Sequence, residues 1–150
     1  MASRYVVRRA TIADCDALAP AFDAYREFFT AKSDPLASAA FLRERIERNE
    51  SVVFGAFDGK RAVGFVQLYP LFSSWYAKRQ WFLSDLFVVT DFRRLGVAAR
   101  LLDECTRHAR DTSARSILVE LPFSEPHLVQ LYEDADYRRD EVFALYRLSL

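Results

Sequence analysis

The chain is poor in the residues that build metal centres and disulfide frameworks. It has two cysteines, Cys15 and Cys105, and two histidines, His108 and His127. They form no CxxC pair and lack the spacing of a zinc site. We therefore expect two reduced, buried thiols, no metal centre and no Ser-His-Asp triad.

Glycine and proline are also scarce, with four and five residues, which excludes a collagen-like or low-complexity chain. Because 21 basic residues balance 21 acidic ones, no net field attracts nucleic acid or an anionic membrane. No apolar run approaches the roughly 18 residues of a membrane span, and the segment MASRYVVRR lacks the apolar core of a signal peptide. The expectation is a cytoplasmic protein without a nucleic-acid or membrane partner.

Apolar and aromatic residues are abundant, at 51% and 15% of the chain. A chain of 150 residues is long enough for one core and too short for two. This composition predicts a single domain over residues 1–150.

The first half of the chain predicts two helices between strands. Residues 5–10 resemble a strand, residues 11–14 a capping-box-like helix start, and the apolar spacing then continues to about Phe29. After Asp34-Pro35 a second helix ends near Asn49. Residues 51–57 and 61–69 then form a hairpin through Asp58-Gly59, ended by Pro70.

The second half predicts a crossover. Residues 80–89 form a third strand of the meander, and residues 96–113 an amphipathic helix leading to a buried strand at 116–121. Such a helix makes the two strands parallel or splayed neighbours. A helix over 126–135 and one or two closing strands within 137–150 complete an α/β fold with a mixed sheet.

The segment from Asp85 to Leu102 carries the clearest motif, a strand followed by a glycine-containing loop that opens a helix. Unpaired backbone N–H groups and the positive end of the helix dipole converge there, an arrangement that binds phosphate. Arg93 and Arg94 flank the loop, and Gly96 leaves room for an anion. An ordinary helix start with two solvated arginines explains the residues equally well.

Arg93-x-x-Gly96-x-Ala98 resembles the Arg/Gln-x-x-Gly-x-Gly/Ala signature of the GCN5-related N-acetyltransferase (GNAT) superfamily. Residues 5–14 and 63–69 resemble its first strand with the helix start and its third strand. Leu131-Tyr132-Glu133 followed by Tyr137 resembles its Leu-Tyr-Glu-x-x-Gly-Phe/Tyr segment, with Asp136 in place of the glycine. The resemblance covers nearly the whole chain.

This resemblance implies a three-layer α/β fold whose mixed, mostly antiparallel sheet has a splayed parallel pair in the centre and helices on both faces. It is closest to the branch of yeast histone, polyamine and D-amino-acid acetyltransferases and small bacterial enzymes. It also implies acetyl-CoA as the co-substrate. The pantetheine arm would pair with the backbone of Leu86, Phe87 and Val88, and the pyrophosphate would lie on Arg93, Arg94, Leu95, Gly96, Val97, Ala98 and Ala99.

Two residues are candidates for the chemistry. Tyr132 resembles the family tyrosine that protonates the leaving thiolate, although a packed ring would explain it too. Asp85 is the only carboxylate in the strand at 80–89, where burial costs free energy unless the group is paired or functional. Polyamine acetyltransferases of the family have a Glu-Asp pair at the positions of Ser84-Asp85. Asp85 could bind the amine, deprotonate it through water, or anchor a loop.

In the family, the acceptor lies between the first two helices and the loop before the motif strand. The residues expected there are Tyr25, Phe29, Tyr69, Phe72 and Ser84. An aromatic wall with one carboxylate suits a cationic amine, while core or dimer packing is the alternative. The resemblance predicts transfer of an acetyl group to a primary amine of a small molecule by direct attack in a ternary complex. A non-catalytic acyl-CoA sensor is the alternative, and the apolar tail at 142–150 predicts a homodimer.

Overall fold

The computed structural model describes residues 4–30 and 32–150. The chain divides into two compact units, of which the first ends at Glu120 and the second is Leu121–Leu150. Each unit is described by itself. Across the described residues, every helix is too short or too polar to cross a lipid bilayer.

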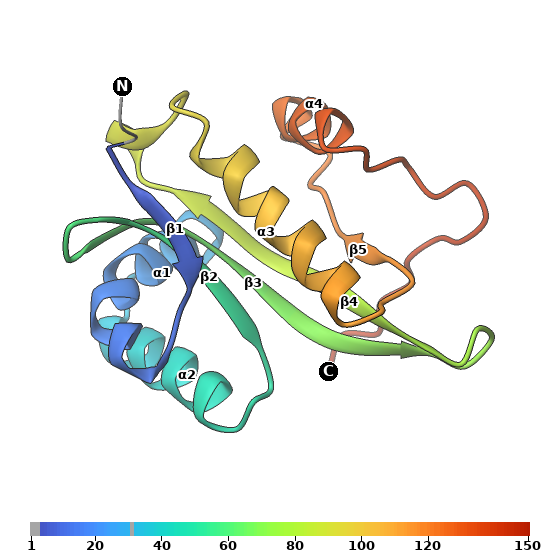
Figure 1. Ribbon diagram of the computed structural model, residues 1–150, viewed down its shortest axis with the longest axis horizontal. Helices are drawn as coiled ribbons and strands as arrows, with labels where there is room; N and C mark the ends of the chain where they lie inside the picture. The colour runs from blue at the N-terminus through green and yellow to red at the C-terminus, as the bar shows by residue number, and fades with distance from the viewer. Residues whose placement is uncertain (1–3, 31) are drawn as a thin grey trace. The chain divides into compact units, whose positions relative to one another are not determined.

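The first unit is built on a five-stranded sheet in which the strand order follows the chain order (Figure 1). The first four strands pair antiparallel, and the last joins its neighbour in parallel. The strands are β1 (Val6–Arg9), β2 (Val52–Asp58), β3 (Arg61–Ser73), β4 (Lys78–Val88) and β5 (Ile117–Val119). The predicted mixed, mostly antiparallel sheet is therefore confirmed. The parallel pair was expected in its centre but lies at the end of the strand order, because no later strand forms among the described residues to pair beyond β5.

Helices cover both faces of this sheet. In Figure 1, α3 (Val97–Asp111) lies in front of the strands, and α1 (Cys15–Thr30) with α2 (Pro35–Glu47) lies behind them. Short 3₁₀ turns at Ile12–Asp14 (η1) and Thr90–Phe92 (η2) precede α1 and α3. The crossover from β4 through α3 to β5 is the one that the apolar spacing predicted.

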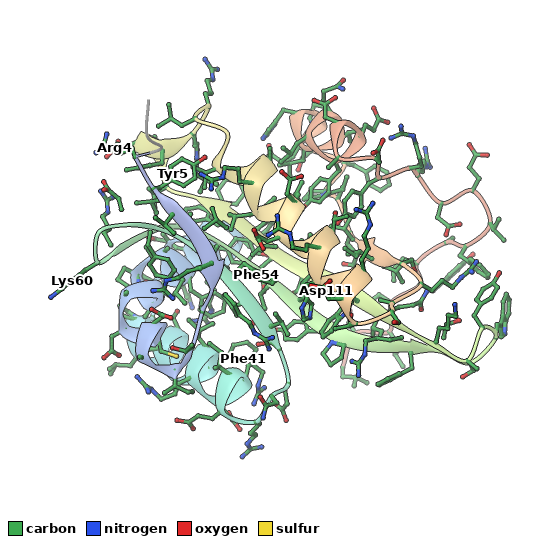
Figure 2. The ribbon with its side chains drawn as sticks, in the orientation of Figure 1. Arg4, Tyr5, Phe41, Phe54, Lys60 and Asp111 are labelled. Atoms are coloured by element: carbon green, nitrogen blue, oxygen red, sulfur yellow. The ribbon has the colours of Figure 1, made fainter. Side chains whose placement is uncertain are left out.

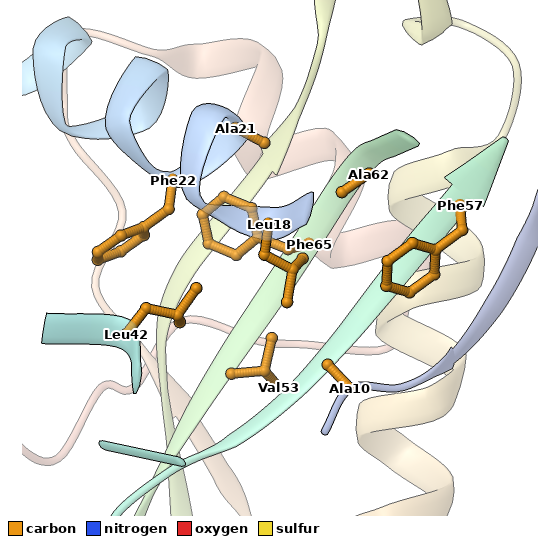
Figure 3. Packing of buried hydrophobic residues seen from close by; sticks show 9 residues of the cluster. All are labelled: Ala10, Leu18, Ala21, Phe22, Leu42, Val53, Phe57, Ala62 and Phe65. Carbon is orange, nitrogen blue, oxygen red and sulfur yellow. The ribbon is translucent and has the colours of Figure 1, made fainter. Parts of the chain in front are cut away.

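The two buried faces explain why β2 is apolar along almost its entire length. On one face, Leu18 and Phe22 of α1 point toward Val53 and Phe65 of the sheet (Figure 3). On the other face, Phe54 of β2 packs against His108 of α3 with ring centroids 5.7 Å apart. A strand covered on both sides reads as a continuous apolar run instead of an alternating one.

A buried carboxylate joins α1 to α2. Asp23 accepts hydrogen bonds from the hydroxyls of Ser33 and Ser38 and from the backbone N–H of Asp34. The two hydroxyl donors are the main reason that the pKa of Asp23 lies below its usual value. Asp34 in turn caps α2 by accepting the Ala37 N–H at 3.0 Å. This network fixes the helix pair that covers the β3 and β4 face.

The hairpin predicted at Asp58-Gly59 is confirmed, since Asp58 pairs with Arg61 and Gly59 has φ 59. The prediction that Pro70 ends the next strand was wrong, because β3 continues to Ser73 and Pro70 lies opposite Trp81. Its pairing with β2 stops at Leu68, so β3 beyond that residue has β4 on one side only. Proline is tolerated at such an edge, where its missing N–H breaks no ladder.

The second unit holds α4 (Pro126–Asp134), which begins with proline in its first turn. Tyr132 on this helix packs edge-on against Tyr137 at 5.2 Å. Asp136 adopts φ 67, the left-handed conformation that glycine favours and aspartate tolerates. No strand forms within 137–150, so the closing strands expected there were wrong: an apolar run becomes a strand only where a sheet edge pairs with it. The homodimer expected from this tail stays a prediction.

Candidate functional site

The central feature of the site is that β4 extends beyond the end of its pairing with β5. Among the described residues, the parallel ladder ends at Leu83 opposite Val119, whereas β4 continues to Val88 and stays paired with β3 throughout. The backbone groups of residues 84–88 on the β5 side therefore lie beyond the last pair of that ladder. An extended ligand can add to such an edge through main-chain hydrogen bonds.

A bulge lies where the two strands part. In the β3–β4 register, Gln67 faces Asp85 and Leu68 faces Leu83, so Ser84 is the additional residue. A bulge bends its strand and redirects the neighbouring side chains. The Tyr25 hydroxyl of α1 donates to the Ser84 carbonyl at 3.3 Å, which ties α1 to the bulge.

The loop that follows β4 turns sharply into α3. Arg94 and Gly96 both have positive φ, at 61° and 77°. A Cβ built on Gly96 would meet nothing closer than the Tyr5 hydroxyl at 3.8 Å, so the space beside the glycine is open. That hydroxyl donates to the Leu95 carbonyl at 3.1 Å, and Figure 2 shows Tyr5 beside the segment that leads into α3. The loop is thus held in place from β1.

These features fit a pyrophosphate. The first N–H groups of α3, on Val97, Ala98 and Ala99, have no carbonyl within the helix to bond. Their partial positive charge faces the open side of Gly96. Arg93 lies at the end of the β4 edge, where its Nε donates to the Val88 carbonyl at 3.0 Å and its guanidinium lies 5.8 Å from the Phe87 ring centroid.

Asp85 is the buried acid of the site, with 8% of its surface exposed. Its Oδ2 accepts from Nε2 of Gln67 at 2.7 Å, and its Oδ1 accepts from the Ser84 hydroxyl at 3.2 Å. Burial raises the pKa of the Asp85 carboxyl above its usual value, and hydrogen bonds from Gln67, Tyr25 and Ser84 oppose that rise. A raised pKa means that this carboxyl holds a proton at a higher pH than an ordinary aspartic acid does.

Three of the predicted acceptor residues gather around Asp85. Hydrogen bonds from Tyr25 and Ser84 act on the Asp85 carboxyl. Burial and the Asp85 charge together raise the pKa of Tyr69 to about 12. Phe29 extends this group, with its ring 5.1 Å from that of Tyr25. We use the name acid pocket for this cluster of side chains, which consists of Tyr25, Phe29, Tyr69, Ser84 and Asp85.

Phe72 does not belong to the acid pocket. It lies five positions beyond Gln67 on β3, roughly 16 Å along the strand. Its ring is 72% exposed and contacts the Arg79 guanidinium at 5.0 Å. The sequence predicted that Phe72 lies in the loop after this strand. Because β3 is longer than predicted, Phe72 lies within the strand, close to the β3–β4 turn.

One residue of the site was missed. Gln67 was treated as part of an apolar run, yet it is the only uncharged polar residue between Ala62 and Leu68. That isolated amide was the available signal. Tyr132 lies in the second unit, so its role as the acid stays a prediction. Among the described residues, no three His, Cys, Asp or Glu side chains gather where they could hold a metal ion.

Comparisons with known proteins agree with the fold. The model of the acetyltransferase (GNAT) family matches residues 18–137. The chain is 38% identical over 144 residues to the uncharacterized N-acetyltransferase YhfO of Bacillus subtilis (strain 168), covering 96% of this chain and 97% of that protein. It is 29% identical over 111 residues to a thialysine N-epsilon-acetyltransferase of Caenorhabditis elegans, covering 74% and 69%. A solved structure of a probable acetyltransferase superposes with a TM-score of 0.92 at 38% identity, covering 97% of both chains.

Replacement of the buried acid is expected to stabilise the protein. Because the folded-state pKa of Asp85 is raised, its contribution to stability is complete below the unfolded pKa and is lost as the pH rises through the folded pKa. Asp85→Asn has the same shape without the charge, so its melting temperature should exceed that of the wild type by a few degrees at pH 8. The difference between the two melting temperatures should become smaller as the pH falls toward 4.

Asp23→Asn is the matched control, because the pKa of Asp23 is lowered and the sign reverses. This variant should melt below the wild type at pH 8, with a difference that shrinks on acidification below pH 4. Thermal denaturation followed by circular dichroism across this pH range measures the melting temperatures of both variants. An Asp85→Asn variant that melts below the wild type at pH 8 would contradict the assignment.

Proposed function

Since the chain belongs to the acetyltransferase (GNAT) family and is an N-acetyltransferase, we propose that it transfers the acetyl group of acetyl-CoA to a primary amine of a small cationic molecule. The observation that carries this proposal is the buried Asp85 beside the unpaired edge of β4. The edge suits the donor and the carboxylate suits the acceptor. Transfer would proceed by direct attack, with donor and acceptor bound together.

The donor would lie along β4 and the loop. Acetyl-CoA, when bound, supplies an acetyl group activated as a thioester. The backbone of Leu86, Phe87 and Val88 would pair with its extended arm, as the edge beyond Leu83 allows. The N–H groups at the start of α3, with Arg93 and Arg94, would hold the pyrophosphate.

The acceptor would enter the acid pocket as a cation. An aliphatic amine is protonated at neutral pH, with an ordinary pKa near 10, and must lose a proton before it can attack. The rings of Tyr25, Phe29 and Tyr69 favour a cation before that loss. Tyr69, with a pKa of about 12, stays protonated and cannot be the base. Asp85 is then the group that takes the proton.

Proton balance requires a donor for the departing sulfur. The ammonium group loses two protons on its way to the amide, and Asp85 would take the first before attack and release it to solvent. Tyr132 would give its proton to the thiolate and regain one from the nitrogen of the tetrahedral intermediate. A relative named as a thialysine N-epsilon-acetyltransferase supports an acceptor that presents a primary amine. A small aliphatic or aromatic body carrying that amine suits the aromatic side chains of the acid pocket.

Donor binding is tested by the loop glycine. Acetyl-CoA or CoA should raise the melting temperature of the wild type, because a ligand bound only by the folded state stabilises it. Gly96→Asp should lose that rise, since it places bulk and negative charge where the pyrophosphate approaches. Gly59→Asp is the matched control, with the same left-handed backbone in the β2–β3 turn and open space around it. A shift retained by Gly96→Asp would mean that the loop does not hold the pyrophosphate.

The acid is tested by Tyr132→Phe, which keeps the ring and deletes the hydroxyl. General acid catalysis contributes about 100-fold to 10,000-fold, so turnover should fall by at least ~10-fold even if water substitutes in part. The melting temperature and the affinity for acetyl-CoA should remain. Tyr137→Phe, in the ring that packs against Tyr132, should keep its turnover. Unchanged turnover in Tyr132→Phe, measured where chemistry limits the rate, would leave Tyr132 a packing residue.

A further inference from the structure

Gln67 is a polar side chain in the middle of the apolar core. Its exposure is 0%, and its neighbours on the strand, Val66 and Leu68, are equally buried. Transfer of an amide from water into such surroundings is unfavourable unless its hydrogen bonds are replaced. An apolar side chain at this position would pack without that cost, so the amide needs a reason other than packing.

The contacts of Gln67 point to Asp85. The two residues lie directly opposite each other in the β3–β4 register, and Gln67 Nε2 donates to Asp85 Oδ2 at 2.7 Å. Its other polar atom, Oε1, is buried and has no hydrogen-bond partner among the described residues. Gln67 therefore retains an unsatisfied carbonyl while its one hydrogen bond goes to the carboxylate, and unsatisfied buried groups of this kind are rare.

The remaining groups that face Asp85 come from every element around it. The Ser84 hydroxyl on β4 donates to Oδ1 at 3.2 Å, and the Tyr25 hydroxyl of α1 also bonds to the carboxyl. Tyr69 of β3 is close enough for its pKa to respond to the Asp85 charge, and Arg45 of α2 acts on Tyr69 in the opposite direction. The hydrogen-bond donors to the carboxylate are thus all neutral, and Gln67 is the fully buried one.

We propose that Gln67 is a positioning residue that fixes the Asp85 carboxylate through Oδ2, so that Oδ1 beside Ser84 is the oxygen that takes the proton of the acceptor amine. This inference rests on the proposed function and adds the residue that orients its base. Oδ2 is engaged by the buried amide, whereas Oδ1 lies beside the half-buried Ser84. With the proton on Oδ1, Oδ2 remains an acceptor, so the Gln67 amide can donate to Asp85 in either protonation state.

The test removes the amide and follows the protonation of Asp85. Gln67→Leu keeps similar bulk and deletes the donor, so the pKa of Asp85 should rise by about one unit or more. Carbon-13 NMR of the Asp85 carboxyl in the free protein measures this rise, with the signal assigned by its loss in Asp85→Asn. The acid limb of the kcat/KM profile should move to higher pH by the same amount. Gln67→Glu, which places a second carboxyl opposite Asp85, should also move the acid limb of the kcat/KM profile to higher pH. This variant replaces Gln67→Leu in the test if that variant does not fold.

Val66→Ala is the matched control, because Val66 is as deeply buried and points to the other face of β3. It should lower stability and leave both the Asp85 titration and the acid limb in place. An Asp85 titration unchanged in the folded Gln67 variants would show that Gln67 only fills the core and would overturn the proposal. The NMR titration needs neither acetyl-CoA nor an amine, so a failure to find acetyl transfer would count against the proposed function and not against this pairing.

Discussion

The separation of β4 from β5 after Leu83 determines where the open edge, the buried acid and the loop of the candidate site lie. Before that point β4 has a neighbour on each side, and after it β3 alone continues the ladder. The bulge at Ser84 falls at the same place, so one stretch of backbone both opens an edge and turns Asp85 toward α1. The loop with Gly96 follows within the same strand-to-helix connection. The proposed donor and acceptor sides therefore share one strand end.

In the proposed function, Asp85 is a residue at which stability and activity oppose each other. Its carboxylate is buried and is bonded only by neutral groups, which leaves its charge weakly compensated. A chain selected only for stability would have an apolar or amide side chain there. Asp23 is the contrasting case, because its hydrogen bonds outweigh the effect of burial, Arg26 adds a favourable charge, and the pKa is lowered. The two buried acids differ in what their neighbours provide.

Local signals in the sequence predicted local structure well. Asp58-Gly59 specified its hairpin, and the spacing of Val97, Leu101 and Cys105 specified α3. Features that depend on distant neighbours were not accessible. Pro70 is tolerated because β2 does not extend beside it, and Gln67 matters because of the register with β4. The tail at 137–150 has the apolar pattern of a strand, yet no strand forms in this described segment.

The proposed transfer of an acetyl group to a small cationic amine is tested most directly with a panel of amines, with CoA release followed as free thiol. We expect thiol release with small cationic primary amines and formation of the acetylated amine in equal amount. Neutral or acidic analogues of the same size should give no release. Acetyl-CoA that binds to the wild type but yields no thiol with any amine would contradict the proposed transfer. The chain would then be a sensor of acyl-CoA and not a catalyst.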